Sequence, residues 1–519
     1  MQSFPLLTVT GAVPLVGAVV VLLLPKTAAR LAKSIALAFS LIALALVVVL
    51  ALRFDPNSGA AFQFTETHSW IRSFGISYSL GVDGIALVLI ALSALLVPLV
   101  IIGGWNDVDN SRGSVKGYFA LLLILETFMI GVFSALDLFL FYVFFEAMLI
   151  PMYFLIGRYG GAQRSYAAVK FLLYSLLGGL LMLAALIGLY VASGNQLGVG
   201  TFDFTALTQL NLDAGTQKIL FLGFFVAFAI KAPLWPFHTW LPDAAAEATP
   251  GSAILLIGVL DKVGTFGMLR YCLPIFPAAS QFYTPVIIAM CVIGILYGAL
   301  LAVGQTDIKR LIAYTSVSHF GFIGLGIFAM TTQGQSGSTF YMLNHGLSTA
   351  VLFLVAGYLM SRRGSRLIAD FGGVNKVAPV LAGVFLFAGL SSLALPGLSS
   401  FVSEFLVLVG TFENYRIVAV VATLGIVFAA LYILWLYQRA MTGPLKDGCE
   451  KISDLRPREV IAVAPLVVLI IALGFFPQAA LNVINPAVSR TMTAVGVSDP
   501  PPTVVVAKAL PVAGGEPQR

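Results

Sequence analysis

The chain has 519 residues, of which 59% are hydrophobic and only 10% carry a charged side chain. Its mean hydropathy is +0.98. Soluble domains carry about 25% charged residues, so this composition excludes a soluble globular protein and predicts an all-α integral membrane protein. The net charge of +6 does not indicate nucleic-acid binding, because the basic residues lie in short loops between apolar stretches.

Cysteine and glycine patterns argue against a redox or nucleotide site. The three cysteines are far apart and form no C-x-x-C motif, which leaves iron–sulfur ligation and a disulfide framework unsupported. No glycine-rich phosphate-binding motif follows a strand. We therefore expect no cofactor and no metal on this chain.

Apolar stretches of membrane-spanning length recur along the sequence. A helix needs about 20 such residues to cross the hydrocarbon core, which here predicts about fourteen transmembrane helices. They are 5–24, 34–53, 83–103, 116–133, 136–157, 166–192, 218–247, 252–271, 281–303, 309–331, 339–361, 376–411, 416–440 and 457–476. The connection 54–82 predicts a small β-like hairpin. The tail after Pro477 is polar and proline-rich, which predicts a surface-bound or disordered segment.

Lysine and arginine are distributed unequally between the two sets of loops. If the amino terminus lies outside, the inner loops include the basic segments 362–366 and 439–458 and hold most of the 29 Lys and Arg residues. Basic loops stay on the cytoplasmic side of a membrane. The sequence therefore predicts that both termini lie on the outer side.

The seventh predicted helix is interrupted next to a buried lysine. In LFLGFFVAFAIKAPLWPFHTWLPDA, Lys231 ends an apolar run and is followed at once by Pro233 and Pro236, then by Pro242. A proline has no N–H and frees the carbonyl four residues earlier, so the ammonium gains possible partners inside the bilayer. A lysine at mid-membrane costs roughly 3 kcal/mol and usually has a function. The alternative is a kinked structural helix with a snorkelling lysine.

A second interruption lies in the twelfth predicted helix, where Pro396 and Gly397 precede Glu404. The two breaks fall in the fourth helix of two consecutive five-helix blocks, spans 4–8 and 9–13. Because five is odd, such blocks must be inverted relative to each other, as in secondary transporters. The expected parts are an N-terminal three-helix segment with an outer hairpin (1–115), two inverted repeats (116–271 and 281–440), and a lateral loop, last helix and polar tail (441–519).

Glu146 is the only charged residue in a long apolar run, and Pro151 breaks the helix one turn later. A buried carboxylate needs a nearby cation to stay ionised, and Lys231 in the same block is the natural candidate. Such a pair can hold its charges together, or let the lysine release its proton as the partner moves away. The alternative is a static structural ion pair.

More ionisable side chains lie inside later helices. Lys262 lies in the eighth, His319 and His345 in the tenth and eleventh, and Glu404 in the twelfth. Imidazole relays protons near neutral pH, although a single membrane histidine is often only a packing residue. Asp261 points about 100° away from Lys262 around the helix and could pair with another helix. We predict one polar line through the bilayer, and leave the role of Glu126 open. Its members are Glu146, Lys231, Lys262, His319, His345 and Glu404.

Several segments resemble the antiporter-like membrane subunits of proton-pumping NADH–quinone oxidoreductase, respiratory complex I. The resemblance is carried by KAPLWPFHTWLPDA, FFEAMLIPMYFLIG, DIKRLIAYTSVSHFGF, LNHGLSTAVLFLVAG and LPGLSSFVSEF. The chain looks like the M-type subunit, whose mitochondrial counterpart is subunit 4, because the twelfth helix carries Glu404 where sister subunits usually carry lysine. Two departures are LPDAAAEA, which lacks a histidine often found there, and Asp261, which replaces an apolar residue.

The resemblance implies a proton-translocating subunit of an enzyme, NADH:quinone oxidoreductase, in which the same six residues pump protons. FMN and iron–sulfur clusters would then belong to partner subunits. The expected partners are the L-type and N-type antiporter-like neighbours, the hydrophilic NADH-oxidising arm, the lipid bilayer and protons, but no nucleic acid. The expected location is a bacterial cell membrane. The alternatives are a subunit of an Mrp-type Na⁺/H⁺ antiporter, the membrane arm of a membrane-bound hydrogenase, and a non-transporting scaffold.

Overall fold

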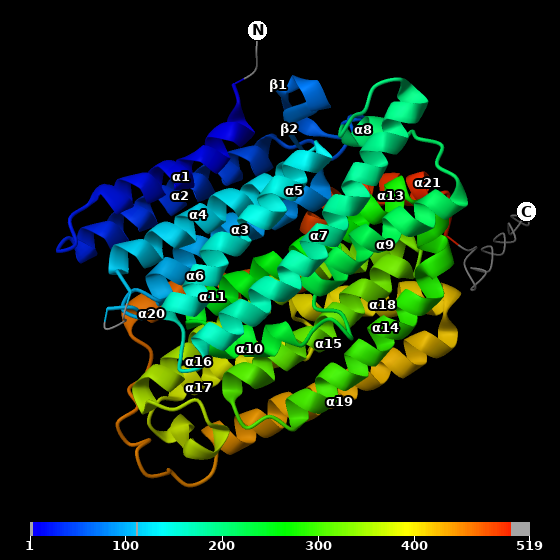
Figure 1. Ribbon diagram of the computed structural model, residues 1–519. Helices are drawn as coiled ribbons and strands as arrows, with labels where there is room; N and C mark the ends of the chain where they lie inside the picture. The colour runs from blue at the N-terminus through cyan, green and yellow to red at the C-terminus, as the bar shows by residue number, and fades with distance from the viewer. Residues whose placement is uncertain (1–3, 110–112, 500–519) are drawn as a thin grey trace, which may run out of the picture.

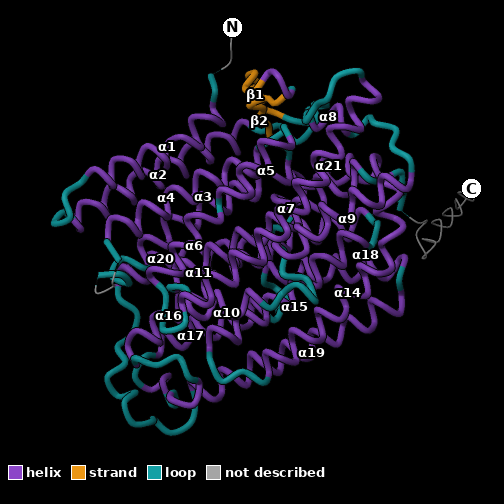
Figure 2. The backbone as a smooth tube through the Cα atoms, viewed as in Figure 1, coloured by secondary structure: helices purple, strands orange, loops and turns teal. Residues whose placement is uncertain are grey.

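The computed structural model describes residues 4–109 and 113–499 and is almost entirely helical (Figure 1). The α-helices are α1 (Leu6–Leu23), α2 (Ala29–Arg53), α3 (Gly84–Gly103), α4 (Val115–Ser134), α5 (Leu138–Ala147), α6 (Leu149–Tyr159), α7 (Arg164–Leu197), α8 (Phe204–Leu207), α9 (Ala214–Lys231), α10 (Trp240–Glu247), α11 (Pro250–Leu255), α12 (Asp261–Gly267), α13 (Leu273–Ile275), α14 (Pro277–Val303), α15 (Ile308–Phe328), α16 (Thr332–Arg363), α17 (Pro379–Ser392), α18 (Ser399–Asn414), α19 (Arg416–Met441), α20 (Pro457–Phe475) and α21 (Gln478–Val495). Two π-helical turns, Leu256–Leu260 and Met268–Cys272, flank α12. The long helices run side by side in one bundle, with loops gathered at its two ends (Figure 2).

Thirteen helical segments in the described part of the chain are long and apolar enough to cross a membrane. This result confirms the predicted multi-pass helical membrane protein. The twelfth predicted span is not among the thirteen, because it is divided into α17, with 14 residues, and α18, with 16. The seventh is divided as well, since α9 ends at Lys231 and α10 begins at Trp240. Both predicted interruptions are therefore present.

The predicted hairpin is confirmed. Strands β1 (Gln63–Ile71) and β2 (Ile76–Val82) pair antiparallel. The Glu66 carboxylate accepts the backbone N–H groups of Leu7, at 2.7 Å, and Thr8, at 3.1 Å. A carboxylate at a helix N-terminus is favoured by the helix dipole, so this contact fixes the hairpin on α1. We call this end of the bundle the hairpin end, and the opposite end, with the segments 362–366 and 439–458, the basic end (Figure 1).

The tail after Pro477 forms a helix that was not predicted. Helix α21 buries Leu481, Ile484 and Val488 and packs against α3 and α16. Its other face is polar, so its average composition resembles that of a surface segment although its apolar residues follow the helical period. The last part of the predicted tail, 500–519, lies outside the described residues.

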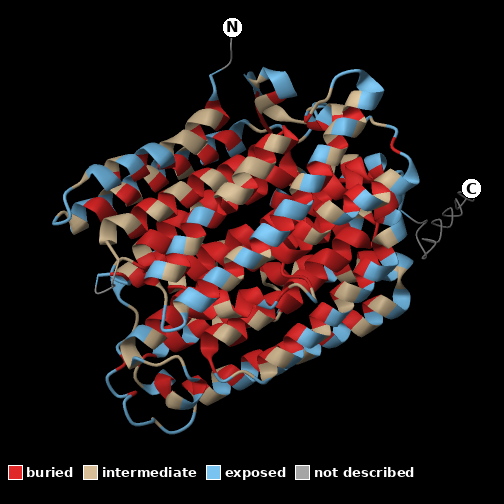
Figure 3. Cartoon of the chain, in the orientation of Figure 1, coloured by how far each residue is buried: buried red, intermediate tan, exposed pale blue. Residues whose placement is uncertain are grey.

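Burial is greatest in the middle of the bundle (Figure 3). The segment Pro250–Ile275 is fully buried over its most apolar window, and α15 and α16 are 94% buried. Helices α1, α2, α7, α14 and α19 instead carry exposed leucine, isoleucine and valine side chains, as lipid-facing helices do. The helices with Lys262, His319 and His345 are therefore the ones most shielded from lipid.

Candidate functional site

The backbone carbonyls left without a helical partner at the break after α9 accept hydrogen bonds from other N–H groups of the same chain. Leu234 N–H donates to the Ala229 carbonyl at 2.9 Å, and the Trp240 indole N–H donates to the Ile230 carbonyl at 2.9 Å. The expectation that these carbonyls would serve the Lys231 ammonium is therefore wrong. The backbone N–H of Leu234 and the indole N–H of Trp240 thus satisfy the carbonyls of Ala229 and Ile230 at the break.

Lys231 and Glu146 lie on neighbouring helices, but in the described part of the chain no ion pair within 4.0 Å joins them. Lys231 is 1% exposed, and its ammonium lies 4.6 Å from the centre of the Phe145 ring, a cation–π contact. Neither Lys231 Nζ nor Glu146 Oε1 has a hydrogen-bond partner among the described residues. The two charges of the predicted pair are thus separated in this structure, because the Lys231 ammonium lies over the ring of Phe145, the residue before Glu146.

Glu146 packs directly against Gly179 of α7. A Cβ atom at Gly179 would lie 1.8 Å from Glu146 Oε1. We expect Gly179→Ala to displace the carboxylate and to lower NADH-driven proton pumping severalfold, while the protein still assembles. Pumping would be measured as proton uptake by inverted membrane vesicles. Gly383→Ala is the matched control, since no atom lies within 4 Å of the added Cβ; equal pumping in the two variants would contradict this role of Gly179.

Lys262 and His345 are brought into direct contact. Lys262 Nζ lies 2.7 Å from His345 Nδ1 and donates to the Ile257 carbonyl at 2.5 Å. Ile257 belongs to a π-helical turn, a local widening of the helix that recurs at functional sites. Unlike Lys262, its neighbour Asp261 makes no side-chain hydrogen bond. Its carboxylate is fully buried, and neither oxygen has a hydrogen-bond partner in the described part of the chain. No hydrogen bond joins Asp261 to another helix among these residues, but its charge interacts with that of Lys231 on α9.

Two further ring contacts follow His345. The His345 and His319 rings lie 5.2 Å apart between centres, and His319 and Tyr341 lie 5.8 Å apart. Tyr341, on α16, lies within electrostatic range of the Glu404 carboxylate on α18. Tyr341 was not among the predicted residues. Its position four residues before His345, on the same helical face, was the available signal.

The interruption between α17 and α18 is tied to this line. Ala394 and Gly397 adopt positive φ angles of 60° and 95°. Asn344 Nδ2 donates to the Ser399 carbonyl at 3.0 Å and to Ser403 Oγ at 3.3 Å, which links α16 to the first turn of α18. Several buried polar atoms nearby have no protein partner among the described residues, and water is the usual partner of such groups. They are the hydroxyls of Ser336, Tyr341, Ser391, Ser399, Ser400 and Tyr432 and the Asn344 side-chain carbonyl.

Helix α10 is held by ion pairs of charged residues that the sequence analysis did not single out. Asp243 accepts from Lys170 at 2.7 Å and from Arg310 at 2.7 Å. Arg366 pairs with Glu247 at 2.9 Å and with Asp307 at 2.7 Å. These contacts join α7, α10 and α15 at the basic end. No sequence pattern indicated them, because the partners are far apart in the chain: Lys170 and Arg310 are 73 and 67 residues from Asp243.

A polar cavity of about 760 Å³ opens at the basic end, and Lys309, Arg366 and Asp107 are among its lining residues. Asp107 is exposed at this cavity, where Arg458 and Lys309 are close enough for their charges to attract its carboxylate. From the cavity wall a chain of hydroxyl groups leads inward. Thr249 Oγ1 lies 2.9 Å from Tyr118 Oη and donates to Ser252 Oγ at 2.8 Å.

The site contains ionisable side chains but no metal-ligand cluster. Within residues 4–109 and 113–499, no group of three or more His, Cys, Asp or Glu residues could hold a metal ion. Two interrupted helices and a buried line of lysine, histidine and glutamate define an antiporter-like membrane protein built to transfer protons.

Comparison with known protein families narrows this class to one family. The model of the NADH:quinone oxidoreductase/Mrp antiporter transmembrane family matches residues 135–429. The model of the amino terminus of NADH-ubiquinone oxidoreductase chain 4 matches residues 13–132. The chain belongs to the family of NADH–quinone oxidoreductase subunit M, or chain 4, a membrane subunit of a proton-translocating enzyme.

Relatives and solved structures agree with this membership. The chain is 54% identical to NADH-quinone oxidoreductase subunit M of Mycobacterium tuberculosis (strain ATCC 25618 / H37Rv), over 97% of both chains. It is 41% identical to subunit M of Rhodobacter capsulatus, covering 93% of this chain and 96% of the relative. Respiratory complex I from Thermus thermophilus contains a chain that is 30% identical, with a TM-score of 0.85, covering 94% of this chain and all of that one. The Mrp complex from Dietzia is 23% identical, with a TM-score of 0.82 over 95% of this chain and all of that one, which shows a shared fold only.

Proposed function

We propose that this chain carries protons across the membrane within complex I, using Glu146, Lys231, Lys262, His319, His345 and Glu404. The observation that carries the proposal is the 2.7 Å contact between Lys262 and His345 inside a fully buried helix. An ammonium donating to a neutral imidazole forms a hydrogen bond along which a proton can move. His319 and Tyr341 extend the same line toward Glu404.

Proton uptake is assigned to the cavity at the basic end. Asp107 is an exposed carboxyl in this cavity and can exchange protons with water there. The hydroxyls of Thr249, Tyr118 and Ser252 lead from the cavity toward the segment that carries Lys262. In this arrangement the basic end faces the cytoplasm of a bacterium, and the hairpin end with both termini faces outward.

Glu146 is assigned a coupling role toward neighbouring subunits. Its side chain is only half-buried, whereas Lys231 is 1% exposed. A partly exposed carboxylate on a lipid-facing helix can respond to a charge on an adjacent subunit, and its distance from Lys231 then sets how firmly that lysine holds its proton. The proposed neighbours are the L-type and N-type antiporter-like subunits. FMN and iron–sulfur clusters are assigned to the hydrophilic NADH-oxidising arm.

The two blocks 116–271 and 281–440 are proposed to be inverted repeats, flanked by the segments 1–115 and 441–519. Each block contains one divided helix, α9/α10 in the first and α17/α18 in the second. Each divided helix ends or begins beside an ionisable residue, Lys231 or Glu404. This arrangement supports one proton half-path in each block.

The test is Glu404→Gln in the whole complex, which removes the last protonatable group of the line. We expect NADH-driven proton uptake by inverted vesicles to fall about tenfold or more. Glu413→Gln, near the end of the same helix, is the matched control and should pump normally. Normal pumping by an assembled Glu404→Gln complex would exclude Glu404 from the path.

A further inference from the structure

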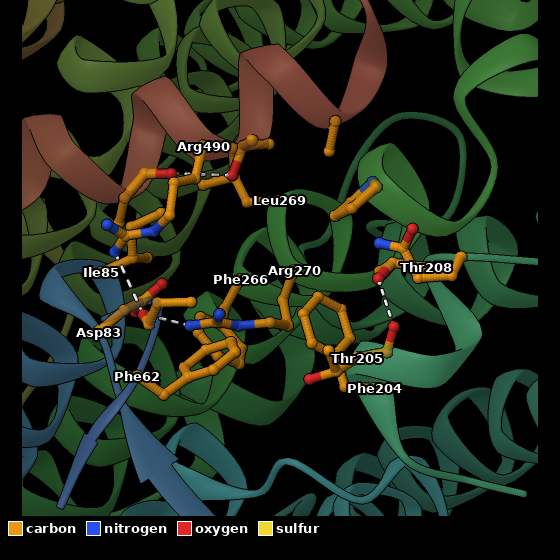
Figure 4. A pocket seen from close by; sticks show the side chains of 16 residues that line it. Phe62, Asp83, Ile85, Phe204, Thr205, Thr208, Phe266, Leu269, Arg270 and Arg490 are labelled. Carbon is orange, nitrogen blue, oxygen red and sulfur yellow. Dashed lines mark hydrogen bonds and ion pairs between the residues drawn. The ribbon is translucent and has the colours of Figure 1, made fainter. Parts of the chain in front are cut away.

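A second cavity lies at the hairpin end of the bundle, close to the Lys262 helix (Figure 4). Its volume is about 480 Å³, and it is enclosed by α8, α21, the start of α3 and the π-helical turn after α12. Phe62, Asp83, Phe204, Phe266, Arg270 and Arg490 are among the residues that line it. The proton path described above uses none of these residues.

Arg270 reaches across this cavity to Asp83, as the dashed line in Figure 4 shows. Arg270 Nη2 lies 2.6 Å from Asp83 Oδ1, and the side chains are only 8% and 6% exposed. The guanidinium also lies over three aromatic rings, at 4.9 Å from Phe62, 5.2 Å from Phe266 and 5.8 Å from Phe204. An arginine stays charged at every physiological pH, so these contacts fix a permanent positive charge.

The position of Asp83 is fixed as well. Its Oδ1 atom accepts the backbone N–H of Ala86 at 2.9 Å and so caps α3. Helix α3 is one of the most buried spans. A carboxylate that caps a buried helix cannot move freely, and it therefore holds Arg270 in one place.

Arg270 and Lys262 belong to the same continuous helical segment, Pro250–Ile275. They are eight residues apart, which is about 12 Å along a helix. The Phe266 ring lines the cavity one helical turn from Lys262 and packs against Phe133, with 5.2 Å between ring centres. The Lys262 ammonium points the other way, toward Ile257 and His345. A short apolar layer and one fixed cation thus separate the Lys262 site from the hairpin-end cavity.

We propose that the Asp83–Arg270 ion pair closes the Lys262 site toward the hairpin end, so that a proton held there passes to His345 instead of escaping directly. A fixed guanidinium repels protons and cations, as charged constrictions do in selective channels. The pair is a barrier and takes no part in the transfer. The inference rests on the proposed path through Lys262.

The test measures passive proton leak in proteoliposomes that hold the whole complex, without NADH. A potassium diffusion potential drives the protons. In Asp83→Asn the guanidinium loses its anchor, and we expect the leak to rise about fivefold or more. NADH reduction of a hydrophilic acceptor, which does not require this cavity, should stay at the wild-type rate. Arg270→Gln removes the charge itself and should show the same rise in leak. It replaces Asp83→Asn as the test variant if Asp83→Asn assembles poorly.

Two controls separate the barrier from a general structural effect. Lys33→Gln breaks another ion pair of a buried basic residue, Lys33 with Asp109 at the basic end, and its leak should match the wild type. The double variant Asp83→Asn/Lys262→Met should lose the added leak, because the escaping proton comes from Lys262. A wild-type leak in assembled Asp83→Asn and Arg270→Gln, or an added leak that survives in the double variant, overturns the barrier. Normal pumping by Lys262→Met alone would instead overturn the proposed path.

Discussion

Replacing Lys262 with methionine is expected to lower NADH-driven proton pumping about tenfold or more, because positioned proton-transfer groups contribute at least that much. The ammonium is fully buried and donates to His345 at 2.7 Å. Methionine fills a similar volume but carries no proton, so the connection between the two halves of the path is lost. Proton uptake by inverted vesicles and NADH reduction of a hydrophilic acceptor would be measured on the same preparation; only the first should fall.

Val263→Ala provides the control for this substitution. Val263 is adjacent and fully buried, and its truncation changes packing without removing a proton carrier. Its pumping should stay near the wild-type level. If Lys262→Met assembles and pumps like Val263→Ala, Lys262 is not part of the path.

Glu146→Gln is expected to have the second large effect. The substitution keeps the size of the side chain and removes its charge, so Lys231 loses the only carboxylate of the neighbouring helix α5. We expect proton pumping to fall about tenfold, since the lysine can no longer alternate between a paired and an unpaired state. The measurement is again proton uptake per unit of NADH oxidised.

Glu146→Asp distinguishes a charge effect from a packing effect. Aspartate keeps the carboxylate but shortens the side chain that packs on Gly179. It should retain much more pumping than Glu146→Gln. Equal losses in the two variants would assign Glu146 a packing role.

The sequence was sufficient to predict the elements of the fold that depend on local composition. Apolar length predicted the spans, and proline and glycine predicted the interruptions beside Lys231 and before Glu404. Helix α21 was missed because only one of its faces is apolar, which lowers its average hydrophobicity. The six ionisable residues were identifiable because a charge inside a span is costly.

Contacts between helices could not be predicted in the same way. The Glu146–Lys231 pair was expected from helix proximity, but the Phe145 ring lies under the ammonium and the charges are apart. The Asp83–Arg270 pair joins residues of two different helices, and only their packing brings the two charges together. Tyr341 contacts His319 because α15 and α16 pack together, and spacing within one helix relates it only to His345. In each case, the directions in which side chains point between packed helices decide which groups meet.

The central claim is that the proton reaching Glu404 arrives through Lys262. Infrared difference spectroscopy of the complex during NADH turnover tests it directly, because the carboxyl band of Glu404 can be identified by its absence in Glu404→Gln. We expect this band in the wild type and expect it to vanish in Lys262→Met, although Glu404 is unchanged there. A Glu404 band that persists in Lys262→Met would contradict the connected path.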